Sequence, residues 1–513
     1  MPAAAQPDYD VAIVGYGPAG AVAAALLGQA GHRVHVCDRL TDVHEIPRAI
    51  ALDHEILRVF QGLGIADAVA AHCEPFTDSV YHGVDGQVIR RMTMLDKPWP
   101  QGHVPSIVFT QPPVERLLRQ RIAQMANVTV ALGVECTAVE QHGDEAPGGP
   151  GVTLTVDGRP VRARWAIAAD GGSSGLRALL GLSLEDLDFD EPWLVVDALV
   201  NERGLARLPA TSVQYCEPER PCTFVIGPGH HRRWEISLKP GEDPRQAATP
   251  EGTWALLQRW MGPEDGTLWR QSSYRFHALV AAQWRAGRVF LAGDAAHMQP
   301  PFLGQGMCQG VRDVANLAWK LDAVLRGTVQ GAAADALLDS YGAERKAHVR
   351  ELTTRIKAVG AVICERDVER ARARDARLLA EAGGPVRPQP RQDVLPPLTG
   401  GLCDGSAGAG TLFPQPRLQA TATRPEAWMD ARHGSGWRLV SDGSLPVDVP
   451  AGLCHIDLAR EPEAEGVVAA WLARHGARAA LLRPDHYTLG SAADAAGIER
   501  LIAAWRRGGV PAA

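Results

Sequence analysis

The chain has 513 residues, which is too long for one compact hydrophobic core, so two or three domains are expected. Its composition of 46% hydrophobic, 22% charged and 6% aromatic residues excludes a fibrous or largely disordered protein. The formal net charge of −7 gives no electrostatic indication of a nucleic acid or an anionic membrane as partner. Nine scattered cysteines without a CxxC pair, and apolar runs too short for a membrane span, predict a cytoplasmic protein.

The first 38 residues have the pattern of a strand–helix–strand unit. Residues 9–15 form a short apolar run rich in β-branched residues, which predicts a buried parallel strand. The alanine- and leucine-rich residues 19–30 predict a helix that ends at Gly31. Residues 32–37 then predict the second strand.

A G-x-G-x-x-G loop, made by Gly15, Gly17 and Gly20, joins the first strand to the helix. The first glycine permits a tight turn, the second lets the backbone approach a pyrophosphate, and the third lets helix and strand pack closely. The N-terminus of the helix offers free N–H groups to the phosphates. Asp38 ends the second strand, where an acidic residue accepts a hydrogen bond from a ribose. The unit therefore predicts a dinucleotide site, without separating FAD from NAD.

In each of two later segments a predicted buried strand again ends beside an acidic residue. Residues 166–177 have Asp-Gly at the strand end, and residues 287–297 have Gly-Asp there, before a glycine-rich turn and a helix through residue 321. The residues singled out in these segments are Asp170, Arg177, Gly293, Asp294, Pro301, Gly304, Gln305, Gly306 and Met307. The sequence contains nothing that resembles a metal-ligand cluster.

Alternating residues over 193–279 predict a half-buried sheet with one face open to a ligand. Residues 128–132 and 152–156 predict strands of a small antiparallel layer, and the proline cluster at 385–397 predicts a linker. Beyond residue 400 the pattern predicts a separate α/β segment. Its strands are expected near 437–441 and 479–482, and its helices near 462–474 and 492–507.

The three strand-end motifs, in this order over residues 10–320, resemble the FAD-dependent aromatic hydroxylases, the single-component flavoprotein monooxygenases built like p-hydroxybenzoate hydroxylase. Within that family the chain is most similar to 3-(3-hydroxyphenyl)propionate hydroxylases and related phenol and resorcinol hydroxylases. The narrower resemblance lies in Pro47-Arg48-Ala49, in residues 213–216, in residues 227–235 and in residues 304–321. Residues 482–487 resemble a strand turn in the thioredoxin-like C-terminal domain of larger members.

The resemblance implies an α/β fold in which a Rossmann-like FAD-binding domain is interleaved with a β-sheet substrate domain. The FAD-binding domain is expected over residues 1–190 and 280–384, and the substrate-binding sheet over 191–279. A linker at 385–399 then leads to a thioredoxin-like domain at 400–513. Because that domain has no CxxC, we expect it to serve packing or formation of a homodimer rather than redox chemistry.

The resemblance also implies roles for individual residues. Asp38 with Arg39 is expected at the adenosine ribose, Asp294 at the ribityl chain or the pyrophosphate, and the helix that starts at 304–307 at the flavin pyrimidine. Asp170 and Arg177 match a motif associated with both FAD and the reduced nicotinamide. Arg48 and Gln111 match positions that contact the flavin and its adenosine part. The residues expected to bind the cofactor are thus Gly15, Gly17, Gly20, Asp38, Arg39, Arg48, Gln111, Asp170, Arg177, Gly293, Asp294, Pro301, Gly304, Gln305, Gly306 and Met307.

The implied reaction takes hydride from NADH or NADPH onto FAD, adds O₂ to form a flavin C4a-hydroperoxide, and transfers one oxygen to a phenolic ring. A general base near the phenol hydroxyl assists by making the ring more electron-rich. The catalytic candidates are Arg48, Tyr215 and His277. His54 and His231 are further candidates for the base, and Arg232, Arg233 and Arg275 are candidates for holding a substrate carboxylate.

Three other functions stay open at this point. The first is a polyketide-tailoring flavin oxygenase that acts on a polycyclic aromatic. The second is a flavin-binding protein that holds a phenolic ligand without turnover. The third is a flavin reductase or dehydrogenase that never uses O₂. The absence of a second G-x-G-x-x-G unit argues against two-dinucleotide oxidoreductases.

Overall fold

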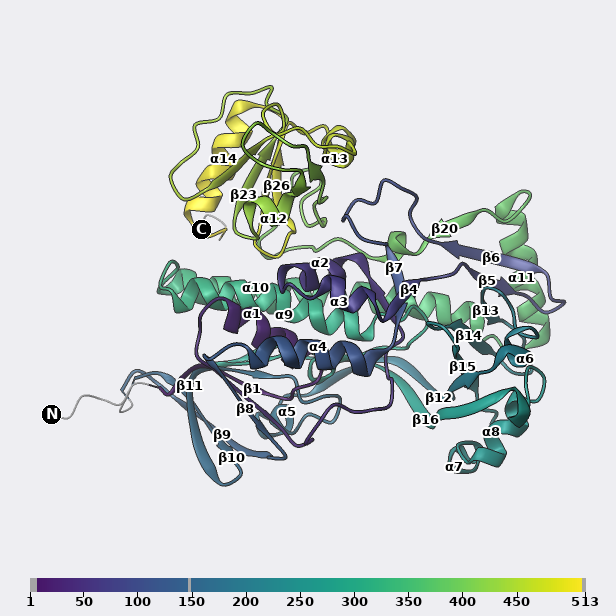
Figure 1. The fold of residues 1–513 in the computed structure, drawn as a ribbon. Helices are drawn as coiled ribbons and strands as arrows, with labels where there is room; N and C mark the ends of the chain where they lie inside the picture. Colours follow the sequence, from purple (N-terminus) through teal and green to yellow (C-terminus); the bar gives the residue numbers. More distant parts are fainter. Residues whose placement is uncertain (1–6, 146–148, 510–513) are drawn as a thin grey trace.

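The computed structural model describes residues 7–145 and 149–509. Figure 1 shows two large sheets side by side, with helices above them and a smaller C-terminal unit over those helices. The first sheet has eight strands in the order β17-β18-β11-β1-β2-β8, with β10 and β9 added beside β11. Its strands are β1 (Tyr9–Val14), β2 (Val34–Asp38), β8 (Val128–Leu132), β9 (Cys136–His142), β10 (Gly151–Val156), β11 (Arg159–Ala168), β17 (Arg285–Ala286) and β18 (Val289–Leu291).

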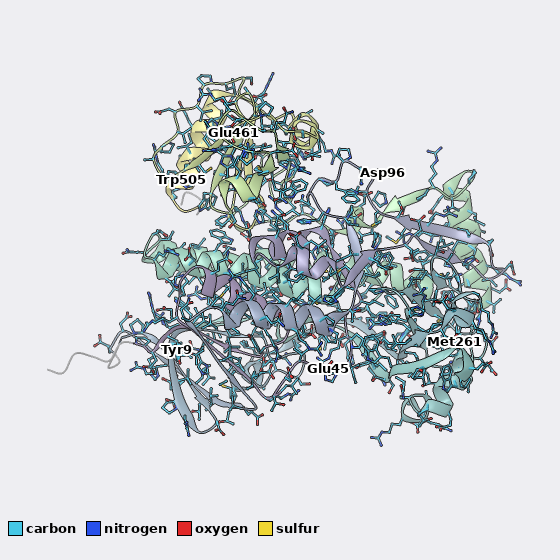
Figure 2. The ribbon with its side chains drawn as sticks, in the orientation of Figure 1. Tyr9, Glu45, Asp96, Met261, Glu461 and Trp505 are labelled. Carbon is cyan, nitrogen blue, oxygen red and sulfur yellow. The ribbon has the colours of Figure 1, made fainter. Side chains whose placement is uncertain are left out.

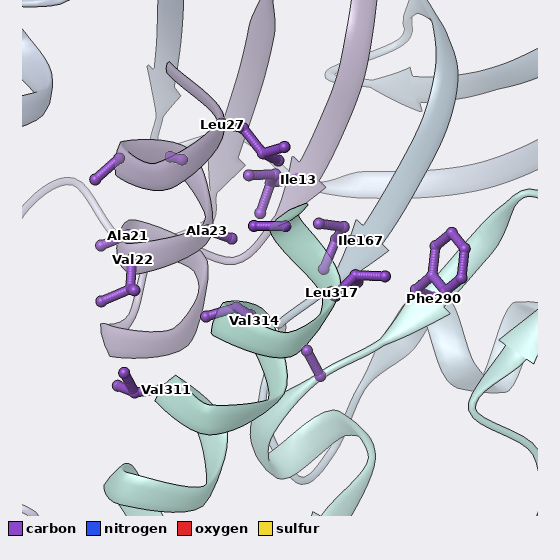
Figure 3. Packing of buried hydrophobic residues seen from close by; sticks show 14 of the residues in the cluster. Ile13, Ala21, Val22, Ala23, Leu27, Ile167, Phe290, Val311, Val314 and Leu317 are labelled. Carbon is purple, nitrogen blue, oxygen red and sulfur yellow. The ribbon is translucent and has the colours of Figure 1, made fainter. Parts of the chain in front are cut away.

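The core of the first sheet forms because its central strands are apolar on both faces. β1 pairs in parallel with β2 and β11, which places Ile13 opposite Val36 and Ile167. Helices α1 (Pro18–Gln29) and α9 (Gly306–Leu325) cover one face, and their buried side chains meet this layer (Figure 3). The alanine-rich α1 brings its backbone close to α9, and that contact fixes the start of both helices at one edge of the sheet.

The strand at 128–132 was expected in an antiparallel layer, and that expectation is wrong. β8 pairs in parallel with β2, so it extends the dinucleotide-binding sheet. Helix α4 (Gln111–Ala123) precedes β8 and packs on α1, as in a helical crossover between parallel strands. Only β9 and β10 form the antiparallel layer, where β10 pairs with β9 and β11.

The second sheet has nine strands in the order β19-β16-β12-β15-β14-β13-β5-β6-β20. These are β5 (Ser79–His82), β6 (Val88–Thr93), β12 (Leu184–Val200), β13 (Ser212–Tyr215), β14 (Cys222–Ile226), β15 (His231–Ser237), β16 (Gly266–Ala281), β19 (His297–Met298) and β20 (Pro388–Pro390). Behind it a second core packs against α7 (Pro244–Ala247) and α8 (Pro250–Leu257), where Figure 2 labels Met261. The other face is turned toward the first sheet and carries the site.

This sheet is wider than the expected range of 191–279. Its strands β5 and β6 come from residues 79–93, and β20 comes from residues 388–390. The boundaries expected at 190 and 280 fall inside β12 and β16, two long neighbouring strands of this sheet. The proline cluster expected as a linker is also structured, because β20 pairs with β6 and a 3-10 turn follows at Arg391–Val394.

The remaining elements frame the two sheets. A three-stranded sheet in the order β3-β7-β4 lies beside α2 and α3, and α10 packs against α9 (Figure 1). Their bounds are β3 (Ala51–Asp53), β4 (Cys73–Pro75), β7 (Ser106–Phe109), α2 (His54–Gly62), α3 (Ala66–Ala70), α5 (Gly175–Leu179), α6 (Glu202–Leu205), α10 (Ala332–Ile363) and α11 (Val368–Ala382).

The C-terminal unit has the thioredoxin-like strand order that the sequence predicts. Its sheet runs β24-β23-β25-β26, with β24 parallel to β23 and β25 antiparallel to both its neighbours. The elements are β21 (Arg417–Leu418), β22 (Ala427–Trp428), α12 (Met429–His433), β23 (Arg438–Ser441), β24 (Cys454–Asp457), α13 (Val467–His475), β25 (Ala479–Leu482), β26 (Thr488–Ala492) and α14 (Ala495–Arg506). A loop over 442–453 stands where a helix usually joins the first two strands. The strands and helices predicted beyond residue 400 are confirmed.

Buried ion pairs hold this unit on the rest of the chain. Arg483, before the turn to β26, donates to Glu344 on α10 over 2.8 Å. Arg58 on α2 donates to Asp430 on α12 over 2.6 Å. Both arginines are fully buried, so the unit is docked rather than tethered.

Candidate functional site

A cavity of about 840 Å³ lies between the two large sheets. On one side it reaches the carboxyl ends of β1, β2 and β11, which is where ligands of open α/β sheets bind. On the other side it reaches the inner face of the nine-stranded sheet. Residues from both predicted domains therefore share one continuous space.

The glycine loop opens this cavity at the end of β1. Gly15 has φ of +101°, and a Cβ there would stand 2.2 Å from the carbonyl oxygen of Ala169. A Cβ on Gly20 would stand 2.0 Å from the carbonyl oxygen of Gly15. A Cβ on Gly17 would meet nothing within 4 Å, and Gly17 lines the cavity. The loop is thus closed on the protein side and open on the ligand side.

Three acidic residues at strand ends line the same cavity. Asp38 Oδ2 accepts a hydrogen bond from the Tyr16 N–H over 2.6 Å, so it is held at the glycine loop. Asp170 Oδ2 accepts from the Leu176 N–H over 3.0 Å, while its Oδ1 is buried with no partner in the described chain. Loss of solvation within the surrounding protein raises the pKa of Asp294, which lines the cavity. The open Gly17 and the unpaired Asp170 oxygen fit a bound dinucleotide.

Gln111 and Arg48 meet at the middle of the cavity. Gln111 Oε1 accepts hydrogen bonds from the backbone N–H groups of Arg48 and Ala49, over 2.8 and 2.6 Å. Its Nε2 donates to Glu115 over 2.6 Å. Gln111 therefore fixes the segment that carries Arg48, and both residues line the cavity, as does Arg39.

The segment at 301–307 closes the cavity from the side of α9. Pro301, Gly304, Gly306 and Met307 line it, and α9 begins at Gly306, so its free N–H groups lie at the wall. A negative charge that develops on a bound ring would be stabilised by this helix end.

Matches to known proteins agree with this geometry. Residues 8–356 match the family described as "FAD binding domain". The chain belongs to the FAD-dependent aromatic hydroxylases. It is 36% identical, over 96% of its length and 94% of the relative, to a probable NADH-specific resorcinol 4-hydroxylase of Rhodococcus jostii (strain RHA1). It is 32% identical, over 97% of its length and 96% of the relative, to a 3-(3-hydroxy-phenyl)propionate/3-hydroxycinnamic acid hydroxylase of Burkholderia vietnamiensis (strain G4 / LMG 22486).

Solved structures show the same fold. The flavin-dependent monooxygenase PieE, in complex with FAD and substrate, superposes with a TM-score of 0.78 at 22% identity, covering 98% of this chain and 100% of that one. Aklavinone-11 hydroxylase with FAD and aklavinone gives a TM-score of 0.77 at 22% identity, covering 98% and 99%. The α/β fold with an FAD-binding domain is therefore confirmed.

Not every residue expected at the cofactor lines the cavity. Gly20 is packed under the loop. Arg177 donates to the carbonyl oxygens of Ala295 and Gly172, over 3.0 and 2.8 Å, and so ties together the two later strand-end loops. Gln305 accepts a hydrogen bond from Arg312 over 2.9 Å on the far side of the turn. We therefore place these three residues behind the cavity wall, where they shape it.

Of the three catalytic candidates, Arg48 lies in the loop before β3, and Tyr215 and His277 lie on the second sheet. Arg48 and His277 line the cavity. Tyr215 does not: its hydroxyl accepts a hydrogen bond from Trp260 over 3.1 Å, and Arg259 covers its ring. Its neighbour Gln214 lines the cavity instead, because successive residues of a strand face opposite sides. We withdraw Tyr215 as a catalytic residue.

The other candidates for a base or a carboxylate anchor are buried or have structural partners. His54 is buried at the start of α2, its Nδ1 has no hydrogen-bond partner in the described chain, and burial lowers its pKa to about 4. His231 Nε2 lies 2.7 Å from Asp197 Oδ1. Arg232 donates to the carbonyl oxygen of Gly229, and Arg275 pairs with Asp190 over 2.8 Å.

An ion cluster on β12, β15 and β16 was missed by the motifs. Asp197 Oδ1 accepts from Arg233 over 2.7 Å, and Arg270 lies 3.5 Å from Asp197 Oδ2. Both arginines also donate to the carbonyl oxygen of Pro47, and Arg233 donates to that of Arg48 over 2.8 Å. The cluster therefore fixes, from the sheet side, the segment that Gln111 fixes from the other side.

A second missed group supports the turn at 304–307. Arg312 on α9 is paired with Asp53 and with Glu55, the latter over 2.6 Å, and it donates to Gln305. The nearest sequence signal was the charged Arg312-Asp313 pair in the middle of this helix.

Searches for two other kinds of site were negative. Within residues 7–145 and 149–509, His, Cys, Asp and Glu side chains form no group of three able to hold a metal ion. Across the same described ranges, every helix is too short or too polar to span a membrane.

Proposed function

We propose that the chain is an FAD-dependent, NADH- or NADPH-consuming monooxygenase that hydroxylates a small phenol. The observation that carries this proposal is the single cavity, which runs from the glycine loop to the polar face of the second sheet. The relatives at 32–36% identity are named for resorcinol and for 3-hydroxyphenyl acids, and they match nearly the whole chain.

FAD, when bound, supplies the acceptance of hydride from the reduced nicotinamide and the activation of O₂. The chain's own contribution is binding and positioning. The glycine loop and the N-terminus of α1 would present N–H groups to the pyrophosphate, and Asp38 would accept from a ribose hydroxyl. The start of α9 directs its N–H groups at the wall where the flavin pyrimidine is expected.

The substrate end is formed by the inner face of the second sheet. Gln214, Thr223 and Glu235 lie in one row across β13, β14 and β15, and all three line the cavity. Phe276 and Phe302 add aromatic walls that exclude water. An aromatic ring with a hydroxyl group matches such a surface, since it needs apolar contacts around the ring and a polar partner at one edge.

The polyketide-tailoring alternative rests on structures that are only 22% identical, so their titles bear on the fold alone. The smaller phenols are favoured because the relatives named for them match at higher identity and over equal length.

Turnover by the purified, FAD-loaded protein tests this proposal. NADH and NADPH oxidation is followed with resorcinol, with 3-(3-hydroxyphenyl)propionate and with a polycyclic phenol, under isotopically labelled O₂. We expect one of the two small phenols to accelerate oxidation and to gain one labelled oxygen atom. Catalase and a hydrogen peroxide assay separate hydroxylation from futile oxidation. Oxidation that no phenol accelerates, or that yields only hydrogen peroxide with every phenol, would contradict the proposal.

A further inference from the structure

Glu235 is the carboxylate at the centre of the substrate face. It lies on β15, opposite Val195 of β12 and Thr223 of β14, and its side chain lines the cavity. The hydroxyl of Thr223, the polar neighbour of Glu235, donates its hydrogen bond to Gln214 over 2.6 Å and so does not donate to Glu235. Only 5% of Glu235 is exposed, and the residue therefore meets the cavity rather than bulk water.

The charged side chains around Glu235 form ion pairs and hydrogen bonds with one another and with the backbone, and not with Glu235. Arg233 on its own strand binds Asp197 and the backbone of residues 47–48, and Arg270 on β16 contacts Asp197 and Pro47. In the part of the chain that the structure describes, the Glu235 carboxyl has neither a hydrogen bond nor an ion pair. It is a buried ionisable group with no protein partner, which is costly unless a ligand uses it.

Other titratable groups share the cavity wall. On β16 they include Tyr274, Arg275 and His277, and outside the sheet they include His44, Arg48, Asp294, His297 and Arg391. Toward the glycine loop the cavity is lined further by Asp38, Arg39, Glu115, Arg119, Glu135 and Asp170. Arg391 donates to the carbonyl oxygen of Leu303, and Arg275 pairs with Asp190.

Burial, with a smaller contribution from the negative Asp197, raises the pKa of Glu235 from 4.5 to about 7. Arg233 and Arg270 act in the opposite direction but do not offset the burial. The group thus changes protonation state near neutral pH, which is the range in which a general base works best.

We propose that Glu235 accepts the proton of the substrate's phenolic hydroxyl, an inference that rests on the proposed function. The O–H bond of the phenol breaks, its electron pair stays on the phenol oxygen, and a new O–H bond forms on the Glu235 carboxylate. No group is oxidised or reduced in this step. The phenolate directs electron density to its ortho and para carbons, and the proton leaves Glu235 for solvent after the product departs.

The experiment compares Glu235→Gln, Glu235→Asp and a matched control, Glu251→Gln, which changes an exposed glutamate on α8 of the same domain. kcat and kcat/KM for resorcinol or for 3-(3-hydroxyphenyl)propionate, whichever the wild type converts, are measured on both sides of pH 7. The wild type should lose activity as the pH falls below about 7, because Glu235 then carries a proton. Glu235→Gln should not show this acidic limb, which is the loss of activity below about pH 7, and its kcat should be about 100-fold lower than that of the wild type at pH 8.

Glu235→Asp should keep the limb at a reduced rate, and Glu251→Gln should follow the wild type. A merely structural role for Glu235 would lower the melting temperature and leave the pH profile unchanged. Reduction of the flavin by NADH without phenol is also measured, and for Glu251→Gln it should stay within about twofold of the wild type.

Should Glu235→Gln fail to fold, Glu235→Ala assayed with added formate takes its place, and formate should restore part of the rate. A Gln variant that keeps the acidic limb, or an Ala variant that formate does not restore, overturns the role of Glu235 alone. A wild type that hydroxylates no phenol overturns the proposed function and this inference with it, so the two failures are distinguishable.

Discussion

The hydroxyl of Tyr487 donates a hydrogen bond to Oε1 of Glu55 over 2.9 Å, and this contact joins the C-terminal unit to the helix beside the cofactor cavity. Glu55 binds Arg312 through its other oxygen, and Arg312 donates to Gln305 at the start of α9. Three contacts therefore connect the thioredoxin-like unit to the turn that closes the cavity. The C-terminal unit, which has no redox motif, thus contributes to the site by supporting the turn at the start of α9.

We predict that Tyr487→Phe weakens FAD binding roughly fivefold, because Glu55 loses a hydrogen bond worth about 1 kcal/mol and holds Arg312 less firmly. The measurement is titration of the apoprotein with FAD by fluorescence. Tyr9→Phe, at the start of β1 (Figure 2), makes the same chemical change away from this connection and should bind FAD as the wild type does. Equal affinities for wild type and Tyr487→Phe would rule out the connection.

Two glycine substitutions should separate folding from cofactor binding. Gly17→Ala adds a methyl group into open space at φ of −72°, so the apoprotein should keep its melting temperature while FAD binding falls at least tenfold. Gly20→Ala places a methyl group 2.0 Å from the carbonyl oxygen of Gly15 and should destabilise the apoprotein itself, by about 1–3 kcal/mol. Thermal denaturation and FAD titration of both apoproteins are the test. A stable Gly20→Ala, or a Gly17→Ala that binds FAD normally, would contradict this assignment.

Asp197→Asn should loosen the Pro47–Arg48 segment, because Arg233 and Arg270 lose their common partner. Removing one member of a buried ion cluster costs about 3–5 kcal/mol. Its neighbours lower the pKa of Asp197 from 3.8 to about 2, so the carboxylate stabilises the fold above about pH 4, and that stabilisation is lost as the pH falls through about 2.

Urea denaturation of the Asp197→Asn protein at pH 7 and pH 3 measures this effect. The difference from the wild type should be large at pH 7 and smaller at pH 3. Asp190→Asn, an exposed carboxylate on the same strand, should change little at either pH. A difference that does not shrink in acid would show that the charge of Asp197 is not what stabilises the cluster.

Glu344→Gln should loosen the C-terminal unit. Glu344 is buried on α10 with Arg483 at 2.8 Å and Lys320 at 2.9 Å, and these partners lower its pKa to about 2. Hydrogen exchange of residues 400–509 should become faster in the variant at pH 7. In the wild type, the protection of these amides relative to their intrinsic exchange rate at each pH should decrease as the pH falls from about 4 toward 2, where the carboxylate gains a proton. Glu351→Gln, exposed on the same helix, is the matched control and should leave exchange unchanged.

The dinucleotide half of the site could be predicted because its signals are local. A strand, a glycine loop and a helix follow one another within residues 9–30, and the acids at 170 and 294 each end their own strand. The substrate half depends on which face of a strand turns inward. Tyr215 and Gln214 are adjacent, but Gln214 lines the cavity and Tyr215 packs against Trp260 on the other face. An error of one residue in the predicted strand orientation therefore places the wrong side chain in the cavity.

Pairing between strands that are far apart in the sequence accounts for the remaining differences between the predicted and the observed structure. Nothing within residues 79–93 indicates that β5 will pair with β13, about 130 residues later in the chain. Asp197, Arg233 and Arg270 likewise look like separate charges until β12, β15 and β16 align them. Glu235 could not be predicted for the same reason, because its surroundings follow from the register of β12, β14 and β15.

The pairing of β20 with β6 joins residues 388–390 to residues 91–93. During synthesis on the ribosome, the edge of the second sheet therefore stays open until almost four hundred residues have been made, while the dinucleotide sheet still lacks β18 until residue 291 has emerged. The nascent N-terminal half thus exposes unpaired strand edges for most of translation. Dividing this protein into two recombinant fragments at residue 384 would leave the outer edge of β6 without β20, and such fragments should aggregate rather than reassemble.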